Sequence, residues 1–377
     1  MKLLIALLIA ACIYSAVRII YSKHWEDGLE IKVDFPDKCV REGDVSTLAC
    51  TISNGKYLPL PVLIVKFAIT RTFIFKNMSG SAVTDQYYRN EYFTLRPYER
   101  LIRSYSFVCS KRGLFGMKDM DVICKDLFLS SEMYATREHE ARLLVLPKRI
   151  PSKNIPLDIR KLLGEIESNL KIMEDPFAFS MIREYQPFDS MHSVNWKSSA
   201  RMDKLMVNTF NTTLQLETVI IVNLSSNLNI RVEKMQEDII RVAATIAAEL
   251  INSKIPVALV TNGRDKESNI SVKVAAGADF RHIISIETAL ARIDLDKEID
   301  PVSAIFDDLN EDISCNREYI FISNERRDYI LDKVNEARNK GLHITYVLPL
   351  SKDEASSPGV SEYALKTGAI RWVMDNE

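Results

Sequence analysis

Glycine and histidine are scarce in this chain, and their scarcity excludes several kinds of active site. The 377 residues include 12 Gly and 5 His. Phosphate-binding loops need glycines where the backbone approaches the phosphate, and no Gly-rich loop of that kind is present. A G-x-S-x-G nucleophile elbow and an H-E-x-x-H zinc motif are also absent. We therefore expect neither nucleotide binding nor nucleophilic catalysis, and we predict a protein that is not an enzyme and holds no cofactor.

One histidine has neighbours that could support acid–base chemistry. His192 lies close in sequence to Asp189 and Ser193, which leaves a hydrolase open as a distant alternative. A partly exposed histidine that is hydrogen-bonded to its neighbours is the favoured interpretation. The other histidines stand in no metal-ligand motif. They are His24, His139, His282 and His343.

Paired cysteines and an excess of positive charge are lacking as well. The six cysteines are scattered, with no C-x-x-C pair and none of the crowding typical of a disulfide-rich domain. We predict buried thiols in a reducing compartment. A net charge of −2, without any sustained basic block, argues against nucleic acid as a partner. The cysteines are Cys12, Cys39, Cys50, Cys109, Cys124 and Cys315.

The N-terminus carries a long apolar run. Leu3–Val17 is apolar almost throughout, and the run extends through Tyr21 if the Arg18 side chain reaches the lipid headgroups. A membrane span needs about 20 residues, so we predict an uncleaved transmembrane anchor over residues 1–23, with membrane lipid as its partner. The basic start and the apolar run also fit a cleaved signal peptide. A third alternative is a lipoprotein cleaved before Cys12, although the residues that follow stay apolar.

The charges that flank this run barely decide its orientation. Lys2 and the amino terminus on one side face Arg18, Lys23 and, in part, His24 on the other, a difference of about one charge. This difference and the unpaired thiols both favour a cytoplasmic location for the soluble part.

The pattern over residues 28–148 predicts an all-β sandwich of immunoglobulin-like type. Short runs alternate apolar and polar residues, and turn pairs such as Asn54-Gly55 and Arg112-Gly113 separate them. Helical spacing is nearly absent. The expected strands are Leu29–Phe35, Val45–Ile52, Val62–Ile69, Tyr92–Leu95, Ile102–Cys109 and Leu143–Leu146.

A proline-rich linker and a helix follow within residues 149–212, and strands then alternate with helices over residues 213–377. Continuous Val, Ile and Leu strands between amphipathic helices predict a mostly parallel sheet covered on both faces. Asn262-Gly263 is expected to turn a hairpin. The expected strands are Thr218–Val222, Pro256–Val260, Ile270–Val274, Tyr319–Ile322, Ile344–Leu348 and Ile370–Val373. The expected helices are Leu157–Leu170, Val232–Ile251, Thr288–Ile293, Ala304–Leu309 and Arg327–Asn339.

Residues 174–210 hold the densest cluster of charged and aromatic side chains. Their spacing resembles the signature of the domain-of-unknown-function family 58, R-E-Y-x-P-G-D-x-x-R-x-I-x-W-x-x-x-A-R followed by K-L-x-V, and the match runs over residues 183–207. The chain departs from this pattern at Phe188, where the family has Gly, and at Met191–Ser193, where it has Arg. The signature residues are Arg183, Glu184, Tyr185, Asp189, Trp196, Lys197 and Arg201.

Two interpretations of this signature are open. In the structural one, its arginines pair with Glu184 or Asp189, while Trp196 and Tyr185 seal the apolar joint between the sandwich and the α/β domain. In the other, the same side chains form an exposed surface for a protein partner, because Trp, Tyr and Arg are the usual anchors of interfaces.

The C-terminal half of that family is similar to the von Willebrand factor type A fold, so the resemblance implies this α/β fold for residues 213–377. Such domains often hold Mg²⁺ or Mn²⁺ with a D-x-S-x-S motif after the first strand. Here that place reads Asn223-Leu224-Ser225-Ser226-Asn227, and Glu325 follows the strand that would supply a later Asp. An amide lacks the charge that offsets the dehydration of Mg²⁺. We therefore predict a degenerate site without metal at Asn223, Ser225 and Asn227, where Asn223 and Ser225 cap the next helix or hold the strand end.

The resemblance implies a partner rather than a reaction. Members of the family commonly accompany MoxR-type AAA+ ATPases. We therefore predict a membrane-anchored interaction or adaptor protein that works with such an ATPase in the assembly or remodelling of client proteins. The alternative is an extracellular, metal-dependent adhesion or ligand-binding module, which would need the opposite topology and an occupied metal site.

Overall fold

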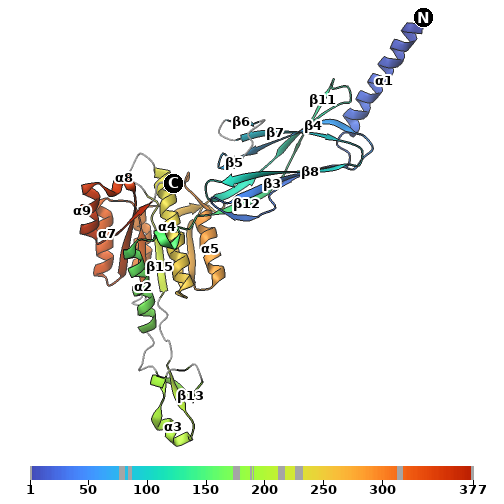
Figure 1. The fold of residues 1–377 in the computed structure, drawn as a ribbon. Coiled ribbons are helices and arrows are strands. Elements are labelled where there is room, and N and C mark those ends of the chain that lie inside the picture. The colour runs from blue at the N-terminus through green and yellow to red at the C-terminus, as the bar shows by residue number, and fades with distance from the viewer. Residues whose placement is uncertain are drawn as a thin grey trace. The chain divides into compact units, whose positions relative to one another are not determined.

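The computed structural model of the chain comprises two compact units, Met1–Lys148 and Arg149–Glu377. Figure 1 traces their helices and strands. The described residues are 2–75, 81–83, 87–172, 179–186, 189, 191–210, 217–225, 232–311 and 317–374.

The first helix, α1 (Lys2–His24), is apolar over nearly its whole length. Among the described residues it is the one helix long and apolar enough to cross a membrane, with 23 residues and a mean hydropathy of 2.5 over its most apolar stretch. Its outer side chains, such as Leu3 and Leu7, are exposed. These properties are consistent with the predicted anchor over residues 1–23.

The rest of the first unit is a β-sandwich, as the sequence predicts. One sheet has the strand order β1-β3-β8-β5, a second has β11-β10-β4-β7-β6, and a smaller one has β2-β12-β9. Every second residue of β3 from Ser46 to Asn54 is buried, because successive side chains of a strand point to opposite faces. The strands are β1 (Leu29–Asp34), β2 (Cys39–Arg41), β3 (Val45–Asn54), β4 (Leu60–Ile69), β5 (Phe73–Phe75), β6 (Ser81–Val83), β7 (Tyr87–Leu95), β8 (Arg100–Cys109), β9 (Gly113–Met117), β10 (Met120–Lys125), β11 (Glu132–Arg137) and β12 (Ala141–Leu146).

The thiols of the first unit divide into two groups. Cys50, Cys109 and Cys124 are buried as predicted, and burial raises the pKa of Cys50 and of Cys124 to about 12 and that of Cys109 to about 11. Cys12 and Cys39 are exposed, so the prediction of buried thiols is wrong for these two. Cys315 lies outside the described residues.

The second unit is built around a mostly parallel sheet with the strand order β17-β16-β15-β19-β20-β21. The pairs β15–β16, β15–β19, β19–β20 and β20–β21 are parallel, whereas β17 is antiparallel to β16. The strands are β15 (Glu217–Val222), β16 (Val257–Asp265), β17 (Ser271–Gly277), β18 (Ile293–Asp294), β19 (Arg317–Ile322), β20 (His343–Ser351) and β21 (Ile370–Met374). The helices are η1 (Ser152–Asn154), α2 (Leu157–Ile172), α4 (Val232–Asn252), α5 (Phe280–Ala291), α6 (Val302–Glu311), α7 (Asp328–Asn339), α8 (Lys352–Ala355) and α9 (Pro358–Thr367).

Side chains of β15 alternate between two apolar cores. Ile220 and Val222 pack with α2, α4 and α5, whereas Val219 and Ile221 pack with α6, α7 and α9. Figure 1 shows β15 between the α4–α5 side and the α7–α9 side. The predicted parallel sheet, covered on both faces, is therefore present.

The predicted linker helix is part of the second unit's core. Ile159, Leu162 and Ile166 of α2 are buried in the same cluster as side chains of α4. Residues 149–172 are thus not a separate connecting segment, because an amphipathic helix buries its apolar face wherever the sheet offers one.

Two further predictions in this unit need correction. Asn262-Gly263 is not a turn, since it lies inside β16, and the chain reverses over 266–270 before β17. The helix expected at Thr288–Ile293 begins at Phe280 and ends at Ala291.

A small two-stranded sheet carries the signature segment. β13 (Phe179–Glu184) pairs in antiparallel fashion with β14 (Met206–Phe210), and η2 (Met191–Ser193) and α3 (Trp196–Met202) lie between them in sequence. We call residues 179–210 the signature lobe. Phe188, where the chain departs from the family pattern, lies outside the described residues.

Candidate functional site

An arginine–aspartate pair organises the loop after β13. Arg183 donates two hydrogen bonds to Asp189, from Nη1 to Oδ2 and from Nη2 to Oδ1, each 2.7 Å long. The backbone N–H of Gln186 donates to the same carboxylate at 2.8 Å. The hydrogen bonds from Arg183 hold the pKa of Asp189 below its usual range. This is one of the bidentate pairs that the sequence suggests, and it makes Asp189 a poor base for a hydrolase that would use His192.

The helix of the signature lobe is held by an asparagine that the sequence analysis did not single out. Asn195 caps α3, because its side chain accepts a hydrogen bond from the Ser198 N–H at 3.0 Å. Its Nδ2 donates to Asn208 Oδ1 on β14 at 2.8 Å. Ser199 Oγ accepts from the Met206 N–H at 2.8 Å, which ties the helix to the same strand. An Asn directly before a helical stretch is a capping pattern that could have identified Asn195.

The aromatic residues of the signature differ in exposure within their own unit. The Trp196 side chain is 64% exposed, so it does not pack into the core of the second unit, and its role in a joint with the sandwich stays a prediction. Tyr185 is half-buried, and its backbone N–H donates to the Leu205 carbonyl oxygen at 2.9 Å. Glu184 pairs with Lys204 at 2.7 Å and not with an arginine of the signature.

The helix α3 presents positive charge and apolar surface together. Lys197 and Arg201 are both exposed, and they lie on one face of the helix because they are four residues apart. Among the described residues neither forms an ion pair. Met191, Met202 and Leu205 of the same lobe are also exposed. An exposed Trp with apolar and cationic neighbours has the composition of a protein-binding surface.

A second cluster lies where β15 and β19 end, beside the point of β16 at which its parallel pairing with β15 stops. We call Asn223, Ser225, Asn262, Ser323 and Glu325 the sheet-edge network. Asn223 Nδ2 donates to Ser323 Oγ at 2.9 Å and to Glu325 Oε2 at 3.1 Å. Its Oδ1 accepts from Asn262 Nδ2 at 2.8 Å and from the Ser225 N–H at 3.0 Å. Asn223 therefore joins the end of its own strand to β16 and to the end of β19, which fits its predicted role of holding the strand end.

The carboxylate of the sheet-edge network is fully buried and is neutralised within the protein. Glu325 Oε1 forms an ion pair with Arg327 and accepts a hydrogen bond from the Tyr329 hydroxyl at 3.2 Å. The Tyr346 hydroxyl donates to the Glu325 backbone oxygen at 2.9 Å. A buried carboxylate is tolerable when it has such partners.

The donor set of this network does not fit a divalent cation. Mg²⁺ requires oxygen ligands that converge on one point, but Asn223 directs its NH₂ group at Ser323 and Glu325, where a metal would require a free oxygen. Within the described part of the chain no group of three or more His, Cys, Asp and Glu side chains could hold a metal ion. Ser226 and Asn227 of the predicted degenerate site lie outside that part.

Asn262 was missed as a member of the network because Asn-Gly usually marks a turn. Its Oδ1 accepts from the Leu224 N–H at 2.9 Å, and its Nδ2 donates to the Asp300 carbonyl oxygen at 3.0 Å. The next residue, Gly263, has no room for a Cβ, which would meet side-chain atoms of Ile293 and Leu224 at 2.7 Å. The Asn-Gly pair thus lies inside the sheet, where Gly263 lets Ile293 and Leu224 pack close to the backbone. In the sequence, the pair follows the predicted buried strand Pro256–Val260 almost directly, and this position could have placed Asn262 in the network.

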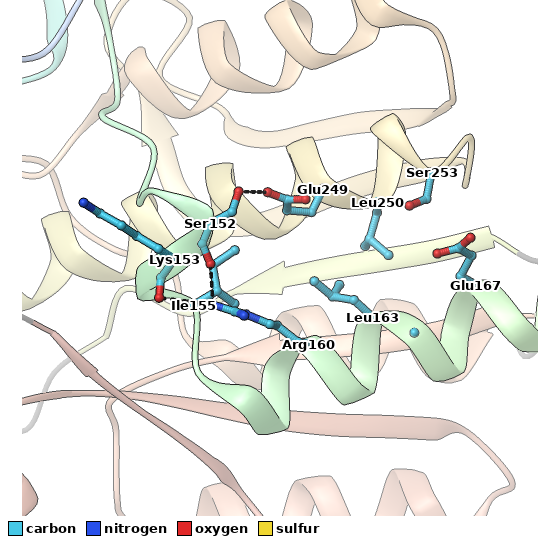
Figure 2. Close-up of a pocket in the computed structure, with 10 residues that line it drawn as sticks. Ser152, Lys153, Ile155, Arg160, Leu163, Glu167, Glu249, Leu250 and Ser253 are labelled. Atoms are coloured by element: carbon cyan, nitrogen blue, oxygen red, sulfur yellow. Dashed lines mark hydrogen bonds between the residues drawn. The ribbon is translucent and has the colours of Figure 1, made fainter.

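A groove between α2 and α4 is the third candidate, and Figure 2 shows its lining. The cavity has a volume of about 440 Å³. Its polar groups bind one another, since Ser152 Oγ donates to Glu249 Oε1 at 3.0 Å and Arg160 Nη2 donates to the Ser152 carbonyl oxygen at 2.7 Å. Leu163 and Leu250 add apolar surface. The Ser152 hydroxyl meets the Glu249 carboxylate directly, and no histidine is among the lining residues to act as its base, so we assign the groove no catalytic role.

Comparison with known proteins agrees with the signature. Residues 181–320 match the model of a family described as "Protein of unknown function DUF58", which supports a protein of that family. No curated protein matches the chain.

Several solved structures are similar to part of the chain. One is the CARDB domain of a Pyrococcus furiosus protein in complex with di-metal ions, with a TM-score of 0.21 and 13% identity over 32% of this chain and 94% of that chain. Another comprises two domains of the major pilin SpaD from Corynebacterium diphtheriae, with a TM-score of 0.23 and 10% identity over 30% of this chain and 51% of that chain. A non-cellulosomal cohesin from Archaeoglobus fulgidus has a TM-score of 0.22 and 6% identity over 31% of this chain and 91% of that chain. No functional argument is built on likenesses at these scores.

Proposed function

We propose that this chain is a membrane-anchored, non-enzymatic adaptor whose signature lobe binds a MoxR-type AAA+ ATPase during the assembly or remodelling of client proteins. The observation that carries the proposal is the exposure of Trp196, which is 64%. Large aromatic side chains are expensive to leave in water, and an exposed Trp on an otherwise hydrogen-bonded lobe is suited to a partner's pocket.

The charges of α3 support the same surface. Lys197 and Arg201 repel each other across one helical turn, which costs about 0.2–0.5 kcal/mol for like charges at this spacing. An acidic patch on the partner would turn this cost into attraction and would speed association. We therefore propose that the ATPase presents an acidic surface around an apolar pocket that receives Trp196.

The second unit is proposed to be a von Willebrand factor type A-like domain that has lost its metal function. The order of its elements, with a buried parallel sheet between two layers of helices, is compatible with that fold. The amide of Asn223 and the guanidinium of Arg327 both contact Glu325. This supports an adaptor over a metal-dependent adhesion module.

Binding of the full chain to a purified MoxR-type ATPase from the same cell tests the proposal. Trp196→Ala and Lys197→Glu should each weaken the complex by tenfold or more, about 1.4 kcal/mol or more, without changing the thermal unfolding of the chain. Leu365→Ala removes another exposed apolar side chain, and Lys118→Glu reverses another exposed charge. Both controls should bind normally. Equal binding by all four variants would reject the signature lobe as the binding surface.

The alternative adhesion module makes opposite predictions. Titration calorimetry of the full chain with Mg²⁺ should give no micromolar site, whereas a site that is lost in Ser225→Ala would favour adhesion.

The exposed thiol of Cys39 can report on which side of the membrane the soluble part lies. In a Cys315→Ser background, an impermeant maleimide should label Cys39 only after the cells are permeabilised if the soluble part is cytoplasmic, and Cys39→Ser should remove that label. Labelling of Cys39 in intact cells would instead place the soluble part outside the cell.

A further inference from the structure

An aromatic stripe on α1 packs against one end of the β-sandwich. Tyr14 and Tyr21 lie on one face of α1 because they are seven residues apart, and Trp25 directly follows the helix, with its N–H donating to the Tyr21 carbonyl oxygen at 3.1 Å. Tyr21 and Trp25 are buried, and the Tyr21 hydroxyl donates to the Pro59 carbonyl oxygen at 2.8 Å. The C-terminal half of the membrane helix is therefore attached to the sandwich.

The hairpin turn between β10 and β11 reaches farthest along this helix. The Phe128 ring lies 5.5 Å from the Tyr14 ring, centroid to centroid, and the Tyr14 hydroxyl donates to Ser130 Oγ at 2.9 Å. In Figure 1 β11 lies beside α1. Leu127, Phe128 and Leu129 at the tip of this turn are 51%, 49% and 57% exposed. Three consecutive apolar side chains are thus presented to the surroundings next to an apolar helix.

The Asp126 side chain organises this turn. The buried Asp126 carboxylate accepts hydrogen bonds from the Ser130 N–H and Ser130 Oγ, both at 2.7 Å, and from Ser131 Oγ at 2.8 Å. Leu129 has φ = 57°, a conformation that costs a bulky residue strain and that Gly or Asn adopts more readily. If only the geometry of the turn mattered, position 129 would be Gly. The Leu129 side chain therefore has a role beyond forming the turn.

The position of Tyr14 within the apolar run decides where this tip lies relative to a bilayer. Tyr14 lies near the middle of the apolar run Leu3–Tyr21, and a bilayer core about 30 Å thick needs about 20 such residues. A helix that spans the bilayer through this run must therefore place Tyr14 within the apolar layer, and the Phe128 ring goes with it.

We infer that the β10–β11 tip, Leu127–Leu129, inserts into the lipid bilayer beside α1, so that the protein contacts the membrane through two elements. The inference rests on the membrane anchor of the proposed function. Inserting three apolar side chains removes their surface from water. Within the turn, the Leu129 N–H donates to the Asp126 carbonyl oxygen at 3.0 Å and the Ser130 N–H to the Asp126 carboxylate at 2.7 Å.

Two exposed tyrosines mark the boundary of the inserted region. Tyr57 and Tyr98 lie in neighbouring loops at the same end of the sandwich, where the Tyr98 N–H donates to the Lys56 carbonyl oxygen at 3.2 Å and Lys56 Nζ donates to the Trp25 carbonyl oxygen at 2.6 Å. Tyrosine rings are enriched at the headgroup level of membranes. This end of the sandwich thus has an apolar tip surrounded by amphipathic rings.

Tryptophan fluorescence of the full chain in brominated lipid vesicles tests the insertion. The probe vesicles contain equal parts of phosphatidylglycerol and phosphatidylcholine brominated on its acyl chains. Phe128→Trp adds one indole at the tip, and the signal of the unmodified chain is subtracted. The added emission should be blue-shifted and mostly quenched by the brominated lipid. Leu127→Trp is the second variant if Phe128→Trp lowers the unfolding temperature.

Val45→Trp is the matched control, because Val45 is also exposed, at 57%, and begins β3 about 30 Å from the strand end that meets α1. Its emission should not be quenched. Flotation of the same samples with the vesicles reports the anchor separately. A chain that floats with an unquenched tip overturns the insertion and leaves the adaptor proposal standing, with a protein partner as the occupant of the tip. A chain that does not float overturns both.

Discussion

The sheet-edge network and the signature lobe contain the same kinds of residue in opposite environments. Each has a carboxylate paired with an arginine, Glu325 with Arg327 and Asp189 with Arg183. The two pairs themselves are alike in exposure, since Glu325 is fully buried and Asp189 is 11% exposed, while their arginines are 51% and 34% exposed. The surroundings of the pairs differ. In the network, the hydrogen-bonding groups meet one another and join the ends of β15 and β19 to β16. In the lobe, similar hydrogen bonds hold α3 on β14, while the Trp196 side chain stays exposed to solvent.

This difference separates polar groups that stabilise the fold from polar groups that are available to a partner. A buried polar group has to be satisfied by the fold, because leaving it unpaired costs about 1–3 kcal/mol. An exposed group is satisfied by water and is free to exchange that water for a partner. The following changes test the comparison.

The largest contrast is between the two tryptophans of the second unit. Trp372 is 1% exposed and Trp196 is 64% exposed. Trp372→Ala should reduce the free energy of unfolding by about 3–5 kcal/mol, since it empties a core site. Trp196→Ala should change it by less than about 0.5 kcal/mol, as for other surface sites. Denaturant unfolding of the full chain in detergent measures both. A large loss for Trp196→Ala would support the predicted seal.

Asn223→Asp should destabilise the sheet edge by about 3–5 kcal/mol at neutral pH, because it places a second buried carboxylate beside Glu325 with only Arg327 to balance the pair. The loss should shrink at acidic pH, where one carboxylate takes up a proton and again donates a hydrogen bond. Asn223→Ala removes the same bonds without adding charge and should cost about 1–3 kcal/mol with no such pH dependence. Unfolding curves at several pH values distinguish the two variants.

Asp265 should give the second unit its acid sensitivity. Hydrogen bonds from Arg292, and from the N–H groups of Glu267 and Ser268, lower the pKa of this buried carboxyl well below its usual range. Its stabilisation is complete above the unfolded pKa of about 3.9 and is lost as the pH falls from there toward the lower folded pKa. Asp265→Asn should be less stable at pH near 7 and should lose less on acidification. Asp189→Asn, in the pair of the signature lobe, should change this pH dependence less.

The N-cap of α3 should have a moderate effect on the lobe alone. Asn195→Ala removes the bond to the Ser198 N–H and the bond to Asn208, and cap removal costs about 0.5–2 kcal/mol. Hydrogen exchange of the α3 amides should increase while amides of β15 stay protected. Asn195→Ser keeps a capping oxygen and should exchange more slowly than the Ala variant. Equal exchange in both would mean that the cap does not hold the lobe.

The smallest expected effect on stability is that of Lys197→Glu. The side chain is exposed and has no ion pair among the described residues, so the free energy of unfolding should change by less than about 0.5 kcal/mol. Relief of the repulsion between Lys197 and Arg201 should by itself stabilise α3 by about 0.2–0.5 kcal/mol. A clear loss of stability would place Lys197 in the support of the lobe.

Local patterns predicted much of this molecule correctly. Alternating apolar and polar residues located β1, β3, β4, β7, β8 and β12 of the sandwich but not its other strands, such as β10 and β11. Uninterrupted apolar runs located the parallel sheet, because each pattern depends on neighbours only a few residues away. The Arg183–Asp189 pair was also accessible, since its partners are six residues apart in sequence. The apolar run at the N-terminus was long enough to identify α1.

What the tertiary structure decided depends on residues that are distant in sequence. Asn262 meets Asn223 because each directly follows the last residue pair of the parallel β15–β16 ladder, Val222 with Thr261, and no local pattern distinguishes this Asn-Gly pair from a turn. Trp196 stays exposed because its lobe is too small to cover it, which its position in the signature did not indicate. The contact of Phe128 with Tyr14 joins a hairpin to a helix more than a hundred residues away. Periodicity determines which face of an element is apolar, but only the folded chain decides what that face meets.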